Sequence, residues 1–185
     1  FAGTETVREQ RDWKANLIRL PLAQDRWFGK MTNQTDGGFA YRGIVDKLVD
    51  ACATGRAYIL LELHWSTCGV WVNEGGKLGQ HNMPDKYSVN FWEDVARRYK
   101  NHPNVIFGVY NEPHDVSWQI WRDGGTITDR PAQQNRNWTP VEYEAVGMQK
   151  LYDAVRATGA KNVVSISGLD WGSDLALNIP KLPRQ

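Results

Sequence analysis

Residues that could do chemistry follow one apolar stretch, Val105-Ile-Phe-Gly-Val-Tyr-Asn-Glu-Pro113. The stretch is typical of a strand buried on both faces of a parallel sheet. Pro113 lacks the N–H that would continue the sheet, so we expect the strand to end with Asn111 and Glu112 facing a cleft. α/β proteins carry their active sites at the carboxyl ends of such strands. We therefore interpret Glu112 as a catalytic acid/base.

Polar residues also stand near the ends of the other predicted strands. Arg19 lies near the end of the first and His64 at the end of the second, while Asp170 and Trp171 follow the fourth. Because parallel strands end at the same edge of a sheet, we expect Arg19 and His64 to meet Asn111 and Glu112 in one cleft. The alternative for Arg19 and His64 is a structural pairing with a buried carboxylate. The predicted strands are Asn16–Pro21, Ala57–His64, Asn104–Asn111 and Asn162–Ser167.

Segments with helical spacing alternate with these strands. We predict helices over Phe39–Thr54, over Ser88–Tyr99, and from the capping box Thr139-Pro-Val-Glu142 to Gly159. The alternation indicates βα units around a parallel sheet, within one domain over residues 1–185. Connections after strands are long and those after helices short, which favours a (β/α)8-type barrel with its active site on the elaborated face. A doubly wound sheet is the competing architecture, but no Gly-x-Gly-x-x-Gly follows any strand.

Tryptophan is the one compositional excess, with nine residues. Several stand in polar segments, where burial alone does not account for them. Exposed indole rings are suited to stacking on flat or ring-shaped ligands. The formal net charge of +1 does not indicate nucleic acid or anionic membrane as a partner, and no run of residues is long and apolar enough to span a bilayer. The tryptophans in polar segments are Trp65, Trp71, Trp118, Trp121 and Trp171.

The two cysteines are predicted to be free thiols. Cys52 and Cys68 flank the apolar run Tyr58–Leu63, which as a strand would separate them by roughly 20 Å, whereas a disulfide needs Cα atoms within about 7 Å. No metal or cofactor is expected. A site built from His64, His81, His114 and Glu112 is conceivable, but no His-x-x-x-His or Cys-x-x-Cys spacing supports it.

Four motifs in chain order resemble the cellulase family of glycoside hydrolases, family 5. They are Asn16-Leu-Ile-Arg-Leu-Pro, Leu61-Glu-Leu-His-Trp, the stretch ending in Asn111-Glu-Pro, and Gly168-Leu-Asp-Trp-Gly-Ser-Asp-Leu175. The resemblance implies a secreted, retaining endo-β-1,4-glucanase with a (β/α)8 fold, acting on β-glucan. It also implies roles for individual residues. Glu112 would be the acid/base, Asn111 would contact the sugar 2-hydroxyl, Arg19 would keep the nucleophile ionised, and His64 would line the cleavage subsite. Sugar contacts are expected from Trp65, Trp71, His114, Trp118 and Trp171.

The chain departs from the family pattern by covering about half of the barrel. Its strands match the second to fifth of the family, and no residue occupies the position of the family nucleophile at the end of the seventh. Glu62 lies about 6.6 Å deeper than His64 by strand rise, and a buried partner for Arg19 or His64 is its favoured role. The chain opens at Phe1 without Met or a hydrophobic signal peptide, so we expect a mature or truncated product.

A half barrel leaves strand edges unpaired and inward side chains such as Leu17, Leu60, Glu62 and Ile106 without an opposite wall. We therefore expect self-association, or a missing partner segment. Three functional hypotheses remain: a glycosidase active only after assembly, a non-catalytic β-glucan-binding protein that keeps the tryptophan cleft, and an unrelated barrel enzyme that uses Glu112 as a base on a small substrate.

Overall fold

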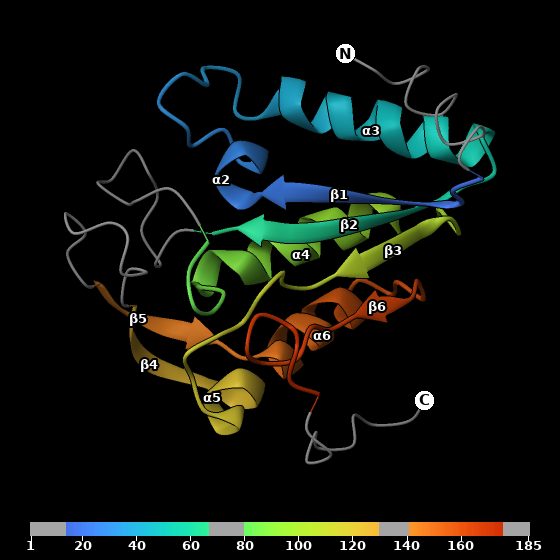
Figure 1. Ribbon diagram of the computed structural model, residues 1–185. Coiled ribbons are helices and arrows are strands. Elements are labelled where there is room, and N and C mark those ends of the chain that lie inside the picture. The colour runs from blue at the N-terminus through green and yellow to red at the C-terminus, as the bar shows by residue number, and fades with distance from the viewer. Residues whose placement is uncertain (1–13, 67–79, 130–140, 176–185) are drawn as a thin grey trace.

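The structure, a computed structural model, describes residues 14–66, 80–129 and 141–175. Its centre is a sheet of four parallel strands in the order β1-β2-β3-β6 (Figure 1). A helix lies between each pair of consecutive strands, which is the arrangement that successive βα units produce. The predicted partial barrel of parallel strands is confirmed. The strands are β1 (Leu17–Ala23), β2 (Tyr58–Trp65), β3 (Val105–Gly108) and β6 (Val164–Ser165), and the helices are α3 (Phe39–Thr54), α4 (Lys86–Tyr99) and α6 (Met148–Ala157).

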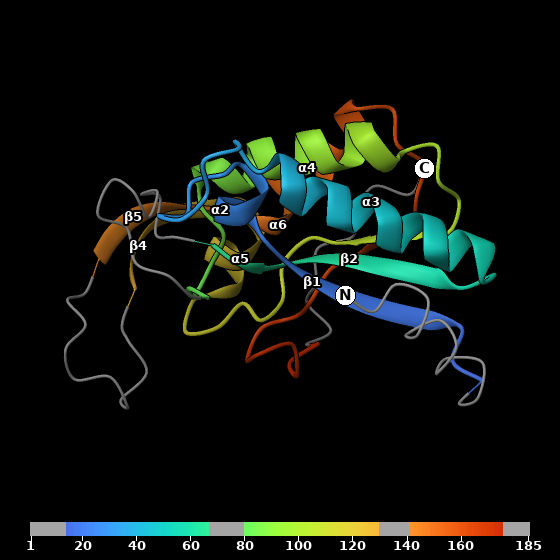
Figure 2. The same cartoon turned by 90° about the horizontal axis from the view of Figure 1, so that it is seen from above.

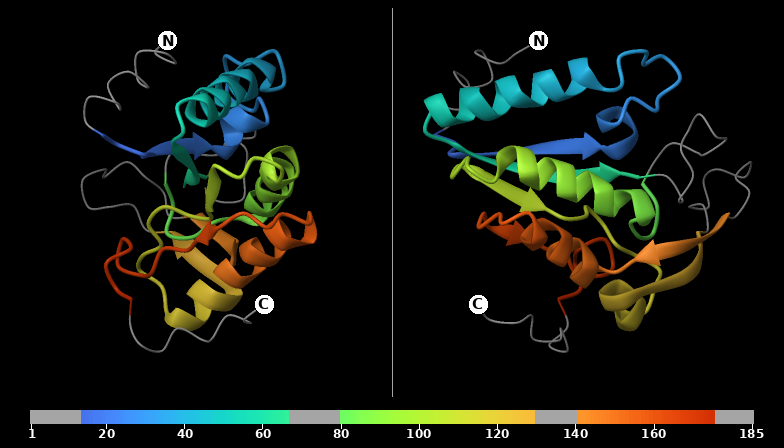
Figure 3. Two further views of the ribbon diagram at one scale, coloured as in Figure 1. Left: turned by 90° about the vertical axis from the view of Figure 1, so that its right-hand side faces the viewer. Right: turned by 180° about the vertical axis from the view of Figure 1, so that it is seen from behind.

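The core lies between the sheet and these three helices, which all cover the same face (Figures 2 and 3). Ile59, Leu61 and Phe107 point to the helices and are at most 1% exposed. From α4, Trp92 packs edge-to-face on Phe107 with ring centroids 5.7 Å apart and donates its indole N–H to the carbonyl oxygen of Val109. Burial of large aromatic side chains with their polar atoms satisfied makes this layer the main source of stability.

The opposite face of the sheet is the one that lines a barrel interior. Leu17 and Tyr58 are 49% and 52% exposed, and Leu60 and Ile106 are half-buried. The expectation that inward side chains lose their cover is therefore confirmed for Leu17 and in part for Leu60 and Ile106. It was wrong for Glu62, which is only 6% exposed, because Arg19 lies against its carboxylate.

The predicted helix from Thr139 is wrong at its beginning. Val141–Val146 forms strand β5, which pairs antiparallel with β4 (Gly124–Asp129), and α6 begins only at Met148. Apolar residues at 141, 145 and 148 fit helical spacing, but Val141, Tyr143 and Ala145 also alternate with two glutamates. Pairing with the preceding strand β4 decides between the two periods, and no pattern within 141–148 encodes that pairing.

Other local predictions need smaller corrections. Helix α4 begins at Lys86, two residues earlier than predicted, and Asp85 is its N-cap. Ser88 occupies the third helical position, where its side chain completes a capping box with Asp85. The long connection after the first strand contains α2 (Gln24–Trp27), and the one after the third contains α5 (Trp118–Asp123) and β4. The α3 bounds were predicted correctly.

Two residues named in the predictions, Cys68 and Trp71, lie outside the described residues. Cys52 is a free thiol, as predicted, and its burial raises its pKa. Within residues 14–66, 80–129 and 141–175, no helix combines the length and apolarity that a membrane span requires.

A buried carboxyl group lies just after β1. Asp25 is 4% exposed, and its Oδ1 has no hydrogen-bond partner among the described residues. The pKa of Asp25 is raised to about 7, chiefly by burial and secondly by the nearby charge of Asp85, while His81 opposes the shift. A folded-state pKa above the unfolded value means that Asp25 stabilises the fold below about pH 4 and that this contribution is lost as the pH rises through 7.

Replacing Asp25 with Asn is therefore expected to stabilise the protein above pH 7, by up to roughly 4 kcal/mol. The difference in melting temperature between Asp25→Asn and wild type should disappear near pH 4, where the wild-type carboxyl is protonated. Thermal melts from pH 4 to 8 measure it, with exposed Asp50→Asn as the control. Equal pH profiles for wild type and Asp25→Asn would contradict the expectation.

Candidate active site

The prediction that Arg19 lies near the end of its strand is wrong, because Arg19 is the third of the seven residues of β1. Its side chain nevertheless links β1 to β2 and to the segment after β3. From β1, its Nη2 donates hydrogen bonds to the Glu62 carboxylate on β2 and to the amide oxygen of Asn111, just after β3. Nδ1 of His64 lies 3.5 Å from both Arg19 Nη2 and the Glu62 carboxylate. The structure thus brings together three of the four residues predicted to be catalytic, Arg19, His64 and Asn111. The favoured role of Glu62, a buried partner for Arg19 or His64, is confirmed.

Room for the Glu62 side chain comes from a glycine on the neighbouring strand. Gly108 is the partner of Glu62 in the β2–β3 register. A Cβ at Gly108 would lie 3.1 Å from Cγ of Glu62, closer than ordinary packing allows. A larger residue at 108 would therefore push Glu62 away from Arg19.

The segment from Asn111 to His114 is held on several sides. Asn111 donates its backbone N–H to the carbonyl oxygen of Leu63 at 3.0 Å and its side-chain N–H to Gln80 Oε1 at 2.8 Å. Gln80 in turn donates to the backbone oxygen of Glu112 at 3.1 Å, and His114 Nδ1 donates to that oxygen at 2.7 Å. Sequence reasoning missed Gln80, because it stands in a long loop without a motif.

Glu112 is the fourth predicted residue, and it follows Asn111 directly. Its side chain is half-buried rather than sealed in apolar packing. None of the described residues forms a hydrogen bond with its carboxylate. A carboxyl group in this position can present a proton to a ligand without first breaking an internal contact.

Two of the predicted sugar-binding aromatics have exposed rings. Trp171 is 53% exposed and stacks on His114 with ring centroids 4.8 Å apart and planes at 14°. Its backbone N–H donates to the oxygen of Pro113 at 3.3 Å, so the loop after β6 lies against the segment that carries Glu112. Trp65, at the end of β2, is 42% exposed and lines a pocket of about 430 Å³ with His64, Pro21 and Tyr41.

The other tryptophans are placed differently. Trp118 is half-buried and packs edge-on against Trp121 at 5.0 Å. Trp121 is 3% exposed and donates its indole N–H to the oxygen of Ser167, so it is a core residue and not a stacking surface. Trp27 and Trp92 are also fully buried. Trp71 lies outside the described residues.

The residues considered for a metal site are not brought together. His81 is buried and pairs with Asp129, whereas His64 lies in the Arg19 cluster and His114 stacks on Trp171. Over the described ranges, no group of three or more His, Cys, Asp or Glu side chains is arranged to hold a metal ion.

The chain is similar to known proteins in both sequence and structure. A sequence model of the family described as Cellulase (glycosyl hydrolase family 5) matches residues 2–185. Endoglucanase EG-II of Hypocrea jecorina is 27% identical over 160 residues, covering 85% of this chain and 31% of that protein. Endoglucanase 1 of Saitozyma flava is 32% identical over 120 residues, covering 64% of this chain and 34% of that protein.

Solved structures show the same fold. The structure of XacCel5A in complex with cellopentaose has a TM-score of 0.62 and 24% identity, covering 91% of this chain and 45% of that one. The endo-β-1,4-glucanase Xac0029 of Xanthomonas axonopodis pv. citri also has a TM-score of 0.62, with 19% identity and 45% of its chain covered. The chain therefore spans about a third of the length of the curated relatives named above and under half of these solved chains.

Removing the cation beside Glu62 is expected to destabilise the fold. Arg19→Leu leaves a carboxylate that is 6% exposed without its partner, which should lower the free energy of unfolding by about 1–3 kcal/mol at pH 7. Adding Glu62→Gln to Arg19→Leu should recover part of the loss, because it removes the buried charge. Urea denaturation provides the measurement.

The matched control is Arg122→Leu, which breaks the exposed ion pair between Arg122 and Asp123. Such surface pairs contribute less than about 1 kcal/mol. Equal losses for Arg19→Leu and Arg122→Leu would show that the Arg19 cluster does not support the fold.

Proposed function

Because the chain belongs to glycosyl hydrolase family 5, we propose that it carries the acid/base side of a retaining endo-β-1,4-glucanase active site. The observation that supports this most is the cluster that Arg19, His64 and Asn111 form across neighbouring parallel strands, directly beside Glu112. Two curated relatives are named endoglucanases, and one similar structure holds cellopentaose. The proposed substrate is accordingly a β-linked glucan.

Each residue of the cluster has a role in this proposal. Retaining hydrolysis needs a protonated carboxyl beside the leaving oxygen and an ionised carboxylate about 5–5.5 Å away on the other side of the bond. Glu112 supplies the first. Asn111 has its oxygen engaged by Arg19 and one amide hydrogen by Gln80, which leaves its second amide hydrogen for the sugar 2-hydroxyl. His64 lines the site at the cleavage point.

The second carboxylate is proposed to come from outside residues 1–185. Glu62 is already engaged by Arg19 and buried, and Asp115 and Asp170 are exposed loop residues. The guanidinium of Arg19 also supplies the positive charge that would keep an incoming carboxylate ionised.

Trp65 and the stacked pair of Trp171 and His114 are proposed to bind sugar rings, together with Trp71 and Trp118. The exposed rings of Trp65 and Trp171 suit the C–H faces of pyranoses. Secretion belongs to the same proposal, because a glucan polymer is too large to reach an enzyme inside a cell. Binding without hydrolysis is the alternative function, favoured by the exposure of Trp65 and Trp171.

Replacing Glu112 with Gln tests the proposal. With the barrel completed by the remaining strands of a relative, Glu112→Gln should lower kcat on soluble β-glucan by about 10²–10⁴, because the amide cannot donate the acid's proton. Binding to cellulose should persist in Glu112→Gln and weaken in Trp171→Ala. Exposed Glu142→Gln is the control for a carboxylate outside the site. Unchanged hydrolysis in Glu112→Gln would refute the assigned role.

We also propose that residues 1–185 self-associate through the uncovered face of the sheet. Tyr58, on that face, is 52% exposed, and so is Ile44 on the outer side of α3. Light scattering coupled to size exclusion should give a mass above that of one chain. Tyr58→Lys should shift the protein toward monomer, while Ile44→Lys should not. A monodisperse wild-type monomer would contradict the proposal.

A further inference from the structure

The backbone oxygen of Glu112 accepts hydrogen bonds from two side chains. Nε2 of Gln80 donates one at 3.1 Å, and Nδ1 of His114 donates the other at 2.7 Å. A carbonyl oxygen has two lone pairs, and both of these donors would lose their partner if the peptide group turned. The two contacts therefore fix the backbone from which the Glu112 carboxyl group extends.

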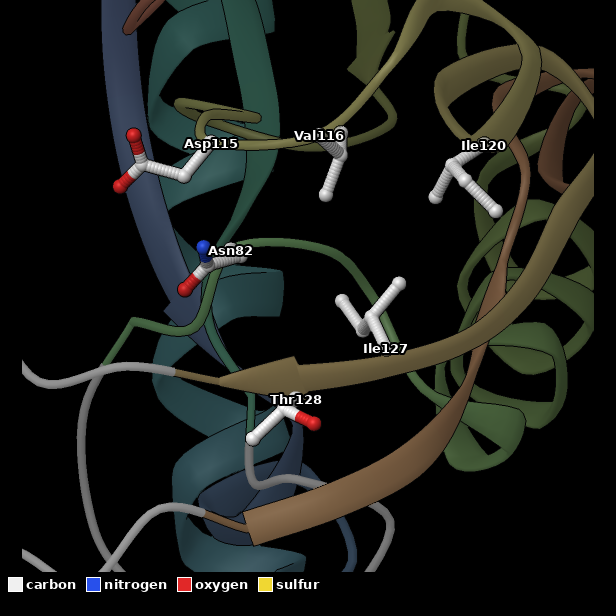
Figure 4. Close-up of a pocket in the computed structure, with 6 residues that line it drawn as sticks. All are labelled: Asn82, Asp115, Val116, Ile120, Ile127 and Thr128. Carbon is white, nitrogen blue, oxygen red and sulfur yellow. The ribbon is translucent and has the colours of Figure 1, made fainter.

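Hydrogen bonds carry this support because packing beside the segment is incomplete. The residues that follow His114 border a pocket of about 590 Å³, with Asp115 and Val116 in its lining (Figure 4). A segment with a pocket along one side has fewer packed neighbours to hold it in place. The orientation of Glu112 consequently depends on the polar contacts around it.

The imidazole ring of His114 is itself held in one orientation. Its backbone N–H donates to the carbonyl oxygen of Asn82 at 3.1 Å. Its ring stacks on the indole of Trp171, with ring centroids 4.8 Å apart and planes at 14°. Because the oxygen of Glu112 can only accept, Nδ1 carries the hydrogen. The stack keeps the ring in the plane in which Nδ1 points to that oxygen.

Trp171 occupies this position at a cost in backbone conformation. Its φ is 55°, in the left-handed region that bulky residues rarely adopt. Its backbone N–H donates to the oxygen of Pro113 at 3.3 Å, and the N–H of Ser173 donates to the oxygen of Asp170 at 3.1 Å. Such conformations persist where the surrounding contacts determine them. The turn after β6 thus holds Trp171 against His114.

The segment 80–83, which supplies the other contacts, is anchored in the protein interior. His81 pairs with Asp129 on β4, and both side chains are at most 3% exposed. The hydroxyl of Tyr143 on β5 donates to the oxygen of Met83 at 2.7 Å. These buried contacts tie the segment to the β4–β5 hairpin, so the donor at position 80 stands on a fixed support.

We propose that His114 is a positioning residue, which acts on the reaction through the backbone of Glu112 and not through a sugar contact of its own. The inference rests on the proposed function. In the stacked pair, one face of the Trp171 indole lies against His114, and the ring is still 53% exposed. Trp171 therefore supplies the surface for a sugar ring, and His114 supplies the contact to the acid/base.

Two replacements of His114 separate these roles. Phe keeps a flat ring for Trp171 but lacks the donor, whereas Asn can place an amide N–H near the position of Nδ1. In the completed barrel used to test Glu112, His114→Phe should lower kcat on soluble β-glucan by about 10–100-fold with little change in KM, because a displaced general acid is inefficient. His114→Asn should recover part of that loss. The control is His102→Phe, which changes a half-buried histidine packed on Tyr99.

The hydrogen bond is also tested in residues 1–185 without any substitution. Nitrogen NMR of the neutral His114 ring should show the proton on Nδ1, the atom that contacts Glu112. A proton on Nε2 with Nδ1 bare would overturn the proposal. This measurement decides the question even if His114→Phe does not fold, which circular dichroism verifies.

The outcomes separate this inference from the function on which it rests. If Glu112→Gln is inactive but His114→Phe either keeps the wild-type kcat or raises only KM, the positioning role is refuted and the glucanase assignment stands. Equal losses of kcat in His114→Phe and His114→Asn, or in His114→Phe and His102→Phe, would also refute the positioning role. If Glu112→Gln hydrolyses β-glucan like wild type, both are refuted.

Discussion

The guanidinium of Arg19 contacts both β2 and the segment after β3, and the arrangement of the site depends on these contacts. The carboxylate of Glu62 is almost completely buried, so a cation beside it is needed to offset the loss of hydration. The same nitrogen also orients the Asn111 amide, which directly precedes Glu112. A charge pair that stabilises the sheet thereby positions the residues proposed to bind the substrate.

The two faces of the sheet differ in how completely other residues cover them. Helices α3, α4 and α6 cover one face with a dense aromatic layer, while Leu17 and Tyr58 remain exposed on the other. Polar residues on the open face are tolerated only where they satisfy one another, as Arg19 and Glu62 do. The candidate site residues therefore lie on the partly exposed face of the sheet. In the family, this face lines the interior of the barrel.

Loops that follow the strands extend the site beyond the strand ends. The segment 80–83 holds Glu112 through Gln80 and anchors the hairpin through His81 and Met83. The hairpin and the segment that carries Glu112 are thus parts of one framework rather than separate features.

Local sequence determined much of this protein. The apolar strand at Val105, the position of His64 near the end of β2 and the bounds of α3 were predictable, because periodicity acts on neighbouring residues. The predicted strand ends at Arg19 and at Asn111 were wrong, because β1 continues to Ala23 and β3 ends at Gly108. Tertiary structure alone decided that Val141–Val146 is a strand, since both periods fit its sequence and β4 supplied the partner. It also decided that Gln80 supports Glu112 and that Trp121 is buried while Trp171 is exposed. Such choices depend on contacts between residues far apart in the chain, which a local pattern does not encode.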